Sequence, residues 1–337
     1  MKIIQWHITE ECNWRCKHCY HDNYLDKGPS LNKLKDIFND IIEIWICERI
    51  NFAWWEPFLR KDFLDFLDYI DNKLWLYNKK LKIWILTNGS FIDEKLLINL
   101  KKINNINFFF QISIEWAKEI NDSIRWIWAF DTILKAMLLL EKFNFYVDFS
   151  FTVSKMNEKY LFWLIPFVKK FDMKIKVRRL VPMWQADSTF LFTALEWYNF
   201  SKRVKKINFK YFYWKKIGFF LNWCSEITSF DYKWFWCWIN QKVILTIMHD
   251  LDVYSCRRLP IVLWNLNDNN ILEIYNWEEY NKQSESYKEI EICKSCQYYN
   301  SCKWWAKCIT YAVNNTLYKE DPQCYIAKKL KWNEKKY

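Results

Sequence analysis

The hydrophobic pattern of the first 200 residues alternates between two kinds of segment. Short apolar runs predict strands at 2–9, 49–53, 82–86, 107–114, 145–153 and 174–180. Longer amphipathic stretches between them predict helices at 31–44, 62–76, 92–103, 129–143, 158–170 and 191–206. Such strand–helix alternation is typical of parallel βα units. We therefore expect an α/β fold, a partial (β/α)6 TIM-type barrel, whose working residues lie in loops after the strands.

The pattern changes after about residue 210. Predicted strands become shorter, turns become more frequent, and eight of the twelve cysteines lie between Cys224 and Cys324. A region with so little regular core needs cross-links. We expect two domains, the partial barrel at 1–210 and a small cysteine-rich domain at 211–337.

Composition narrows the class of protein further. Hydrophobic residues make up 52% of the chain, yet there is no long apolar run and no signal-peptide pattern, so we expect a cytoplasmic protein without membrane contact. In that compartment, twelve cysteines favour metal or redox chemistry over disulfides. The net charge of +11 serves solubility or an acidic partner. Nucleic acid is disfavoured as that partner, because the basic residues are spread along helices rather than gathered in a stripe.

Glycine is strongly depleted and tryptophan is strongly enriched. The chain has 3 glycines and 23 tryptophans, whereas average usage predicts about 24 glycines for this length. A fold needs glycine where φ is positive or where the backbone approaches a ligand closely. Either this fold avoids such positions, or many of the tryptophans stand where glycine belongs.

Three cysteines follow directly on the first predicted strand. Cys12, Cys16 and Cys19 have the spacing C-x3-C-x2-C. Three thiolates in one loop can ligate three irons of a cubane and leave the fourth iron open to a small molecule. The alternative is a zinc knuckle completed by His18 or His21.

These residues resemble the signature of the radical S-adenosylmethionine (radical SAM) superfamily, with His18 as the aromatic residue before the last cysteine. Four further segments are similar to family motifs after the second, third, fourth and sixth strands: FAWWEPFLR (52–60), ILTNGS (85–90), ISIEWAKEINDSIRWIWAF (112–130) and RRLVPMWQA (178–186). The resemblance covers about residues 3–326.

The resemblance implies that Cys12, Cys16 and Cys19 hold a 4Fe–4S cluster, which cleaves SAM to methionine and a 5′-deoxyadenosyl radical. It also implies that Glu56 orients the methionyl amino group, and that three residues after the fourth strand contact the ribose and carboxylate. The full set of SAM-binding residues implied in this way is His18, Trp54, Trp55, Glu56, Pro57, Asn88, Ser113, Glu115 and Arg125.

Tryptophan occupies glycine positions of these motifs at Trp54, Trp55, Trp116, Trp126, Trp128 and Trp184. The same holds further along the chain at Trp264, Trp304 and Trp305. UGA encodes tryptophan in one variant genetic code and glycine in another. We hypothesise that the gene uses UGA for glycine. The codons at positions 54, 55 and 116 test this hypothesis, because UGG there would refute it. If the tryptophans are instead genuine, the indoles of Trp54 and Trp55 would fill the space in which the protein backbone must approach the methionine of SAM, and the chain would bind SAM poorly or not at all.

The cysteine-rich region resembles the SPASM extension of peptide-modifying radical SAM enzymes. The resemblance implies one auxiliary 4Fe–4S cluster on Cys224, Cys237, Cys256 and Cys308 and another on Cys293, Cys296, Cys302 and Cys324. Two features depart from the family. Leu251 occupies a position that is glycine in the family, and five residues rather than the usual three separate Cys302 from Cys308. One auxiliary cluster could therefore be open or absent, and a zinc ribbon is the alternative. Cys47 fits neither set and is expected to be a buried apolar thiol.

The resemblance favours a peptide or protein substrate, modified by a maturase of the ribosomal-peptide or sulfatase type, with a reductant such as flavodoxin or ferredoxin. Tetrapyrrole side-chain decarboxylation, as in haem-pathway relatives, is the alternative. A protein that is not an enzyme is the remaining alternative, either an iron–sulfur electron carrier or a zinc-binding module that binds nucleic acid. Because the first strand begins almost at the start of the sequence, we expect no leader-binding domain ahead of it.

Overall fold

The computed structural model describes residues 2–19, 27–45, 47–53, 55–171, 173–211, 237–240, 242–267, 271, 278–302 and 306–334. Its strands are β1 (Ile3–Trp6), β2 (Arg49–Phe52), β3 (Leu81–Thr87), β4 (Ile106–Ser113), β5 (Tyr146–Val153), β6 (Lys174–Arg179), β7 (Ile244–Ile247), β8 (Asp252–Cys256) and β9 (Leu259–Asn265). Its barrel helices are α1 (Leu31–Ile44), α2 (Phe63–Leu76), α3 (Glu94–Leu100), α4 (Lys118–Ile124), α5 (Ala129–Lys142), α6 (Glu158–Lys170) and α7 (Ala194–Tyr211). The later helices are α8 (Glu278–Glu285), α9 (Glu291–Lys294), α10 (Tyr299–Cys302), α11 (Lys307–Asn314) and α12 (Tyr325–Glu334).

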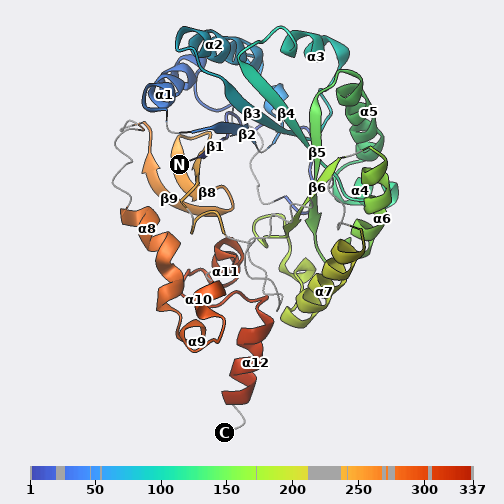
Figure 1. The fold of residues 1–337 in the computed structure, drawn as a ribbon, viewed down its shortest axis with the longest axis vertical. Helices are drawn as coiled ribbons and strands as arrows, with labels where there is room; N and C mark the ends of the chain where they lie inside the picture. Colours follow the sequence, from blue (N-terminus) through green and yellow to red (C-terminus); the bar gives the residue numbers. More distant parts are fainter. Residues whose placement is uncertain are drawn as a thin grey trace.

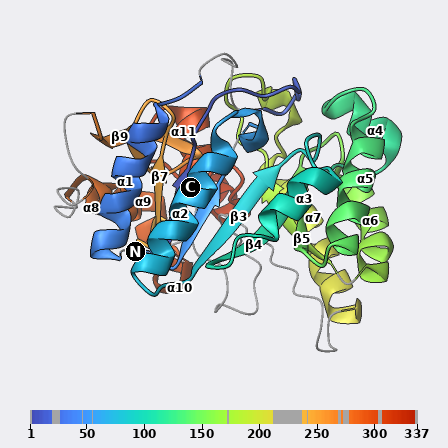
Figure 2. The same ribbon diagram turned by 90° about the horizontal axis from the view of Figure 1, so that it is seen from above.

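The strands form one curved sheet with helices on its outer side (Figure 1). In the described part of the chain its order is β6-β5-β4-β3-β2-β1-β7-β8-β9. The strands from β1 to β6 pair in parallel, as does β7 with β1. Figure 2 shows α1, α2, α3, α5 and α6 following one another around the rim. The predicted α/β partial barrel is confirmed.

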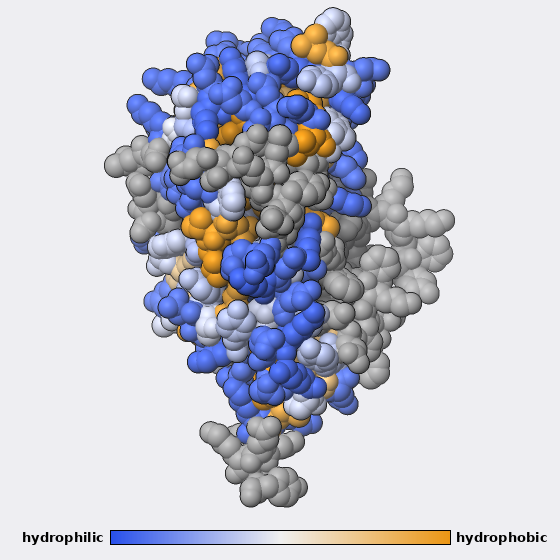
Figure 3. All heavy atoms as spheres, turned by 90° about the vertical axis from the view of Figure 1, so that its left-hand side faces the viewer, coloured by the Kyte–Doolittle hydropathy of each residue, from blue (hydrophilic) through white to orange (hydrophobic). Residues whose placement is uncertain are grey.

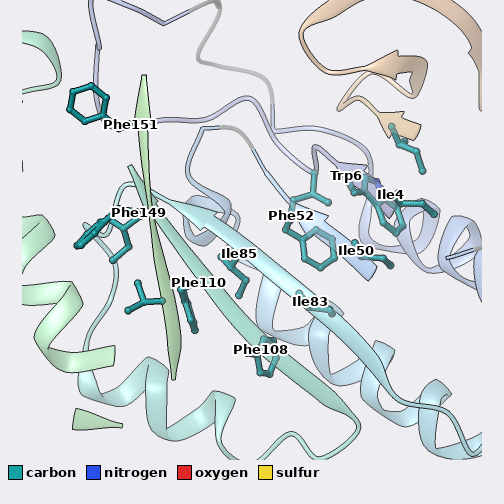
Figure 4. Close-up of a cluster of buried hydrophobic side chains, with 14 of the residues drawn as sticks. Ile4, Trp6, Ile50, Phe52, Ile83, Ile85, Phe108, Phe110, Phe149 and Phe151 are labelled. Atoms are coloured by element: carbon teal, nitrogen blue, oxygen red, sulfur yellow. The ribbon is translucent and has the colours of Figure 1, made fainter. Parts of the chain in front are cut away.

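The parallel register places apolar side chains on the helix-facing side of the sheet. Ile4 pairs with Ile50, which pairs with Ile83, and the next step along the sheet reaches Phe108. Two residues further along each strand, a second row is formed by Trp6, Phe52, Ile85 and Phe110, and all four side chains are fully buried. Figure 4 shows these rows meeting between the strands and the helices. The alternate positions face the barrel interior and are mostly polar.

Helix α1 illustrates how local sequence sets the element boundaries. The Ser30 hydroxyl accepts a hydrogen bond from the Lys33 backbone N–H at 3.2 Å, which caps the first turn. Just before it, Gly28 has φ +75°, and a Cβ there would lie 2.4 Å from the Ile8 carbonyl oxygen. The helix therefore begins where a glycine lets the chain pass against the strand that precedes the first cysteine motif.

The cysteine-rich region contributes to the same sheet. β7 pairs in parallel with β1, and β8 and β9 follow it as antiparallel strands. At the other end of the barrel, buried Arg179 forms an ion pair with Asp321 at 2.7 Å and donates to Gln323 Oε1 at 2.8 Å. Strands β7–β9 and helix α4 are elements that the sequence pattern did not single out. The division at residue 210 remains a prediction.

The face that carries α1, β9 and α8 is mainly hydrophilic (Figure 3). Apolar residues appear on it in small groups between charged ones. Among the described residues, no helix has both the length and the apolar character that a membrane crossing requires.

Four tryptophans adopt left-handed backbone conformations. Trp45 has φ +47°, Trp55 has +46°, Trp128 has +67° and Trp184 has +51°. This region costs an L-residue roughly 1–2 kcal/mol and is normally occupied by glycine. Three of the four belong to the motif positions singled out above, and Trp45, which ends α1, belongs to none. Trp54, Trp304 and Trp305 lie outside the described residues.

Replacing Trp128 by glycine should raise the free energy of unfolding by about 1 kcal/mol, because the left-handed strain disappears. Little packing is lost, since the side chain is 68% exposed. Trp75 is the matched control: it is 70% exposed but lies in α2, where glycine should cost up to about 1 kcal/mol. Denaturant unfolding of both variants measures the two changes. A loss of stability in Trp128→Gly equal to that in Trp75→Gly would contradict the prediction.

Candidate functional site

The three cysteines of the first motif border one cavity, which we call the first cavity. It has a volume of about 160 Å³ and lies where the loop after β1 meets the C-terminal ends of other strands. Its further lining includes His18, Trp55, Thr87, Asn88, Ser113, Arg125, Arg178, Arg257 and Arg258. The structure thus brings together residues from the C-terminal ends of β1, β2, β3, β4 and β6 and from the loops that follow them, as the barrel prediction requires.

Burial dominates the chemistry of these thiols. It raises the pKa of Cys12 to about 12 and also raises that of Cys16, which Arg125 partly offsets. A buried thiolate therefore needs a cation beside it, and the irons of a cluster supply this charge. The soft donor set on one cavity fits an iron–sulfur cluster. Among the described residues, no three His, Cys, Asp or Glu side chains converge on a single metal ion, whereas the three cysteines of a cubane each ligate a different iron. His21, the other candidate zinc ligand, lies outside the described residues.

Glu56 is fully buried behind the wall of the first cavity. Its Oε2 accepts hydrogen bonds from the Thr87 hydroxyl at 2.7 Å and the Asn88 N–H at 2.9 Å, and its Oε1 accepts one from the Phe58 N–H at 3.3 Å. Burial raises the pKa of Glu56 to about 7 despite these donors. Pro57 follows it at the start of a short 3₁₀ turn, Pro57–Leu59. The carboxyl group is thus fixed by the loop after β3 and retains acceptor capacity on Oε1.

Asn88 joins the loops after β1 and β3. Its Nδ2 donates to Asn13 Oδ1 at 2.8 Å, and its Oδ1 accepts from the Ser90 N–H at 2.8 Å. Between them, Gly89 has φ +89° with Cβ of Ala136 only 3.1 Å from where its own Cβ would be. This loop holds Asn13, between Cys12 and Cys16, in place against β3.

Glu115 and Arg125 form a buried pair beside the thiols. Arg125 Nη2 donates to Glu115 Oε1 at 2.8 Å, and Asn157 Nδ2 donates to Glu115 Oε2. Burial raises the pKa of Glu115 to about 7. His18 Nε2 lies 3.8 Å from Glu115 Oε1. Burial, and to a smaller extent the positive charge of Arg125, hold the pKa of His18 well below its usual range. The His18 ring is therefore neutral at pH 7.

Trp55 narrows the first cavity. Its φ is +46°, it is 8% exposed, and its ring packs edge-on against His7 and His249 at centroid distances of 5.5 and 5.9 Å. The indole stands where the resemblance expects bare backbone beside the methionine of SAM. Its neighbour Trp54 lies outside the described residues.

Two further cavities are lined by six of the remaining cysteines. The second cavity, about 240 Å³, lies inside the barrel and is bordered by Cys237 and Cys256. The third cavity, about 530 Å³, is lined by four cysteines of one predicted set, namely Cys293, Cys296, Cys302 and Cys324. Burial raises the pKa of Cys293 to about 11 and that of Cys324 to about 12.

The other predicted cysteine set is only partly described. Cys308 is buried at the start of α11 and does not line any of the three cavities, while Cys224 lies outside the described residues. Cys47 is 3% exposed and part of the apolar core, as expected for a thiol without a ligand role.

Comparison with known proteins identifies the class. Residues 6–162 match the family model of the radical SAM superfamily. Residues 6–162 therefore carry a radical SAM domain, and the family that this domain defines consists of enzymes that use a 4Fe–4S cluster and SAM. The enzyme prediction is therefore confirmed over the electron-carrier and nucleic-acid alternatives.

Relatives by sequence are distant. An uncharacterised protein of Methanocaldococcus jannaschii is 24% identical over 282 residues, which cover 81% of this chain and 92% of that protein. The Fe-coproporphyrin III synthase of Methanosarcina barkeri is 27% identical over 159 residues, which cover 46% of this chain but only 38% of the synthase.

Solved structures share the fold over almost the whole chain. The structure of anSMEcpe with bound AdoMet and the Cp18Cys peptide has a TM-score of 0.77 at 18% identity and covers 99% of this chain and 97% of its own. SuiB of Streptococcus suis bound to S-adenosylmethionine has a TM-score of 0.73 at 14% identity and covers 96% of this chain and 77% of its own. The likeness therefore includes the cysteine-rich region as well as the barrel.

Sequence reasoning missed several residues of the site. Asn157 and Thr87 hold the two buried carboxyl groups, and Arg178 and Arg258 line the first cavity. None of them stands out by spacing. Thr87 and Arg178 stand in segments quoted above for their similarity to family motifs, and Asn157 follows a predicted strand, so position was an available signal for these three. Arg258 follows β8, which the sequence pattern did not predict.

Replacing Trp55 by glycine should enlarge the first cavity and strengthen SAM binding at least tenfold, because the indole occupies its wall. Equilibrium dialysis of cluster-reconstituted protein measures the affinity. Trp184→Gly is the matched control, since Trp184 also has a positive φ but does not line the first cavity. Equal SAM affinity in wild type and Trp55→Gly would contradict the prediction.

Glu56 should give stability a pH dependence. Its pKa of about 7 in the fold exceeds its ordinary value of 4.5, so the folded state keeps a proton that the unfolded state has released between these values. The free energy of unfolding should therefore fall, by about 2–3 kcal/mol, as pH rises from 4.5 to 7.

Glu56→Gln should remove that part of the slope, as measured by denaturant unfolding across the same pH range. Glu291→Gln, whose parent side chain is 85% exposed, should leave the slope unchanged. Parallel curves for wild type and Glu56→Gln would refute the assignment.

Proposed function

We propose that this radical SAM enzyme modifies a peptide or protein, as a maturase of the ribosomal-peptide or sulfatase type. The observation that carries the proposal is that three cavities of the fold are lined by cysteines. Besides the first cavity, which holds the SAM motif, the second and third cavities are bordered by cysteines of the C-terminal region. The end-to-end likeness to anSMEcpe, whose structure holds a peptide, supports it.

In this proposal Cys12, Cys16 and Cys19 hold the SAM-cleaving cluster. When bound, that cluster supplies the electron that splits SAM into methionine and a radical able to take a hydrogen atom from the substrate. Glu56 accepts a hydrogen bond from the methionyl amino group, and its Thr87 and Asn88 donors fix its direction. Ser113 and the Arg125 guanidinium border the same cavity, where they would bind the ribose and the carboxylate.

The remaining cysteines are assigned to one or two auxiliary 4Fe–4S clusters. Cys293, Cys296, Cys302 and Cys324 would hold one of them, because all four line the third cavity. Cys237 and Cys256 would hold the other together with Cys224 and Cys308. The raised pKa values of Cys293 and Cys324 mean that these thiols, like those of the first motif, need metal to ionise.

We further assign a reductant such as flavodoxin or ferredoxin as electron donor and the cytoplasm as location. Both follow from the chemistry, because low-potential electrons and reduced thiols require a reducing compartment.

Tetrapyrrole side-chain decarboxylation is the second candidate. The Fe-coproporphyrin III synthase relative favours it, although that match covers less than half of this chain. Assays with iron-coproporphyrin and with peptides separate the two candidates, since only one class of substrate should be consumed together with SAM.

Replacing Cys12, Cys16 and Cys19 together by alanine should lower bound iron and abolish 5′-deoxyadenosine formation from SAM under reducing, anaerobic conditions, because no thiolate remains to hold the first cluster. Iron and sulfide analysis measures the first effect and chromatography of the reaction the second. Cys47→Ala is the control, because Cys47 lies in the apolar core, and it should keep both properties. A triple variant that still cleaves SAM would exclude the proposed site.

A further inference from the structure

One buried arginine in the loop after β2 bonds to both ends of the segment that carries the first cysteine motif. Arg60 is 8% exposed and ends the short 3₁₀ turn that begins at Pro57. Its Nη1 donates to the carbonyl oxygen of Ile8 at 2.7 Å and to that of Lys27 at 3.0 Å. Its Nη2 donates to the carbonyl oxygen of Pro29 at 2.8 Å. Because Ile8 precedes the three cysteines and Lys27 follows them, a single guanidinium group joins the two ends of this segment.

A carboxylate fixes the direction of this guanidinium group. Arg60 Nη2 also donates to Asp62 Oδ2 at 3.1 Å, and Arg60 Nε lies 2.6 Å from Asp62 Oδ1. We call Arg60, Asp62 and the three carbonyl groups the Arg60 clamp. A planar guanidinium group carries five N–H donors in a rigid arrangement, whereas a lysine ammonium carries three donors on one nitrogen. Lysine at residue 60 would therefore keep the charge but lose part of this set of bonds.

The two ends of the cysteine segment approach each other closely at Gly28. Its φ is +75°, and a Cβ there would lie 2.4 Å from the Ile8 carbonyl oxygen and 3.4 Å from Arg60 Nη1. A side chain at residue 28 would therefore push the Ile8 carbonyl group away from the guanidinium group that binds it. Substitution of Gly28 is thus a second way to open the Arg60 clamp, one that leaves the arginine in place.

The loop that carries Arg60 also carries Glu56. The Glu56 backbone N–H donates to the Glu11 carbonyl oxygen at 3.1 Å, directly before Cys12. The loop after β2 therefore contacts the start of the cysteine segment through Glu56 and both of its ends through Arg60. In the proposed site the Glu56 carboxyl group receives the amino group of SAM while the thiols hold the cluster. One SAM molecule can reach both only if their spacing is fixed.

We propose that Arg60 is a positioning residue of the SAM site, which holds the thiols of the first motif at a fixed distance from Glu56. The inference rests on the proposed function, in which Cys12, Cys16 and Cys19 hold the first cluster. Arg60 is not among the residues that line the first cavity, so it acts through the backbone of the cysteine segment rather than on SAM. Loss of a group that orients metal ligands typically lowers metal affinity or activity by roughly ten- to hundredfold.

Hydrogen–deuterium exchange of the full chain before cluster reconstitution tests the backbone arrangement alone. Exchange of the Glu56 amide should be about tenfold faster in Arg60→Lys than in wild type, because the released cysteine segment no longer stays against this N–H. Gly28→Ala should have the same effect. Asp62→Asn, which weakens the hold on the guanidinium group, replaces Arg60→Lys if circular dichroism shows that the latter does not fold. Lys61→Gln is the matched control, since it alters the exposed neighbour of Arg60 and should leave the exchange unchanged.

Iron release and SAM binding test the role of Arg60 in the site. After reconstitution with iron and sulfide, Arg60→Lys and Gly28→Ala should lose iron to a chelator about tenfold faster than wild type. SAM affinity is measured by equilibrium dialysis with Trp55→Gly added to every variant, because the indole then no longer narrows the first cavity. In that background Arg60→Lys and Gly28→Ala should each weaken SAM binding about tenfold, and Lys61→Gln should change neither property.

An arginine with a structural role alone would lower the free energy of unfolding but leave iron release and SAM affinity of the folded protein unchanged, and that result would overturn the proposal. Unchanged exchange at Glu56 in both Arg60→Lys and Gly28→Ala would overturn it as well. Faster iron release and weaker SAM binding in these variants, in a protein that modifies no peptide, would reject only the substrate class of the proposed function and leave the role of Arg60 standing.

Discussion

The candidate functional site depends on the register in which the parallel strands β1 to β6 pair with one another. Because β1 to β6 pair without a slip, every second side chain points to the helices and the others point into the barrel. A shift by a single residue would exchange the two sets and bury charge against the helices. The apolar set, for example Ile50 and Phe110, makes the core. The polar set, for example Gln111 and Asp148, is left for the cavities.

The same register decides where the buried carboxyl groups lie. Glu56 and Glu115 follow β2 and β4, and each is held by donors from a neighbouring strand end, such as Thr87 and Asn157. Both are fully buried with raised pKa values near 7. A carboxyl group in this state is ready to become charged when a cation arrives, and the amino group and sulfonium of SAM are such cations. Glu115 already has Arg125 beside it at 2.8 Å, so only Glu56, whose printed partners are uncharged donors, waits for a cation in this way.

Much of this could be predicted from the sequence, for identifiable reasons. The predicted helices at 31–44 and 158–170 match α1 and α6 residue for residue, because amphipathic spacing and the Ser30 cap are local signals. Pairing of β7 with β1 was not predictable in this way, because it joins residues some 240 positions apart and its apolar run is only four residues long. Motif resemblance found the cavity-lining residues Asn88 and Arg125, but no local signal pointed to Arg258, which reaches the same cavity from a turn between later strands. Long-range packing, not propensity, decides such positions.

The left-handed tryptophans are best understood by comparison with the other residues in that region. Asn78, Asn144 and Asn315 also have positive φ, as short polar side chains often do. Leu251 has φ +71° but is 4% exposed, so its burial offsets the strain. Trp128 is 68% exposed and has no such compensation. The four tryptophans lie in different local settings. Trp45 ends α1, Trp55 lines the first cavity, Trp128 precedes α5 and Trp184 lies in the loop after β6. Trp184 is 48% exposed, so at both exposed sites a genuine indole would cost roughly 1–2 kcal/mol without burial to offset it. Glycine at these positions would remove the cost with the backbone unchanged, which supports the hypothesis that the gene uses UGA for glycine.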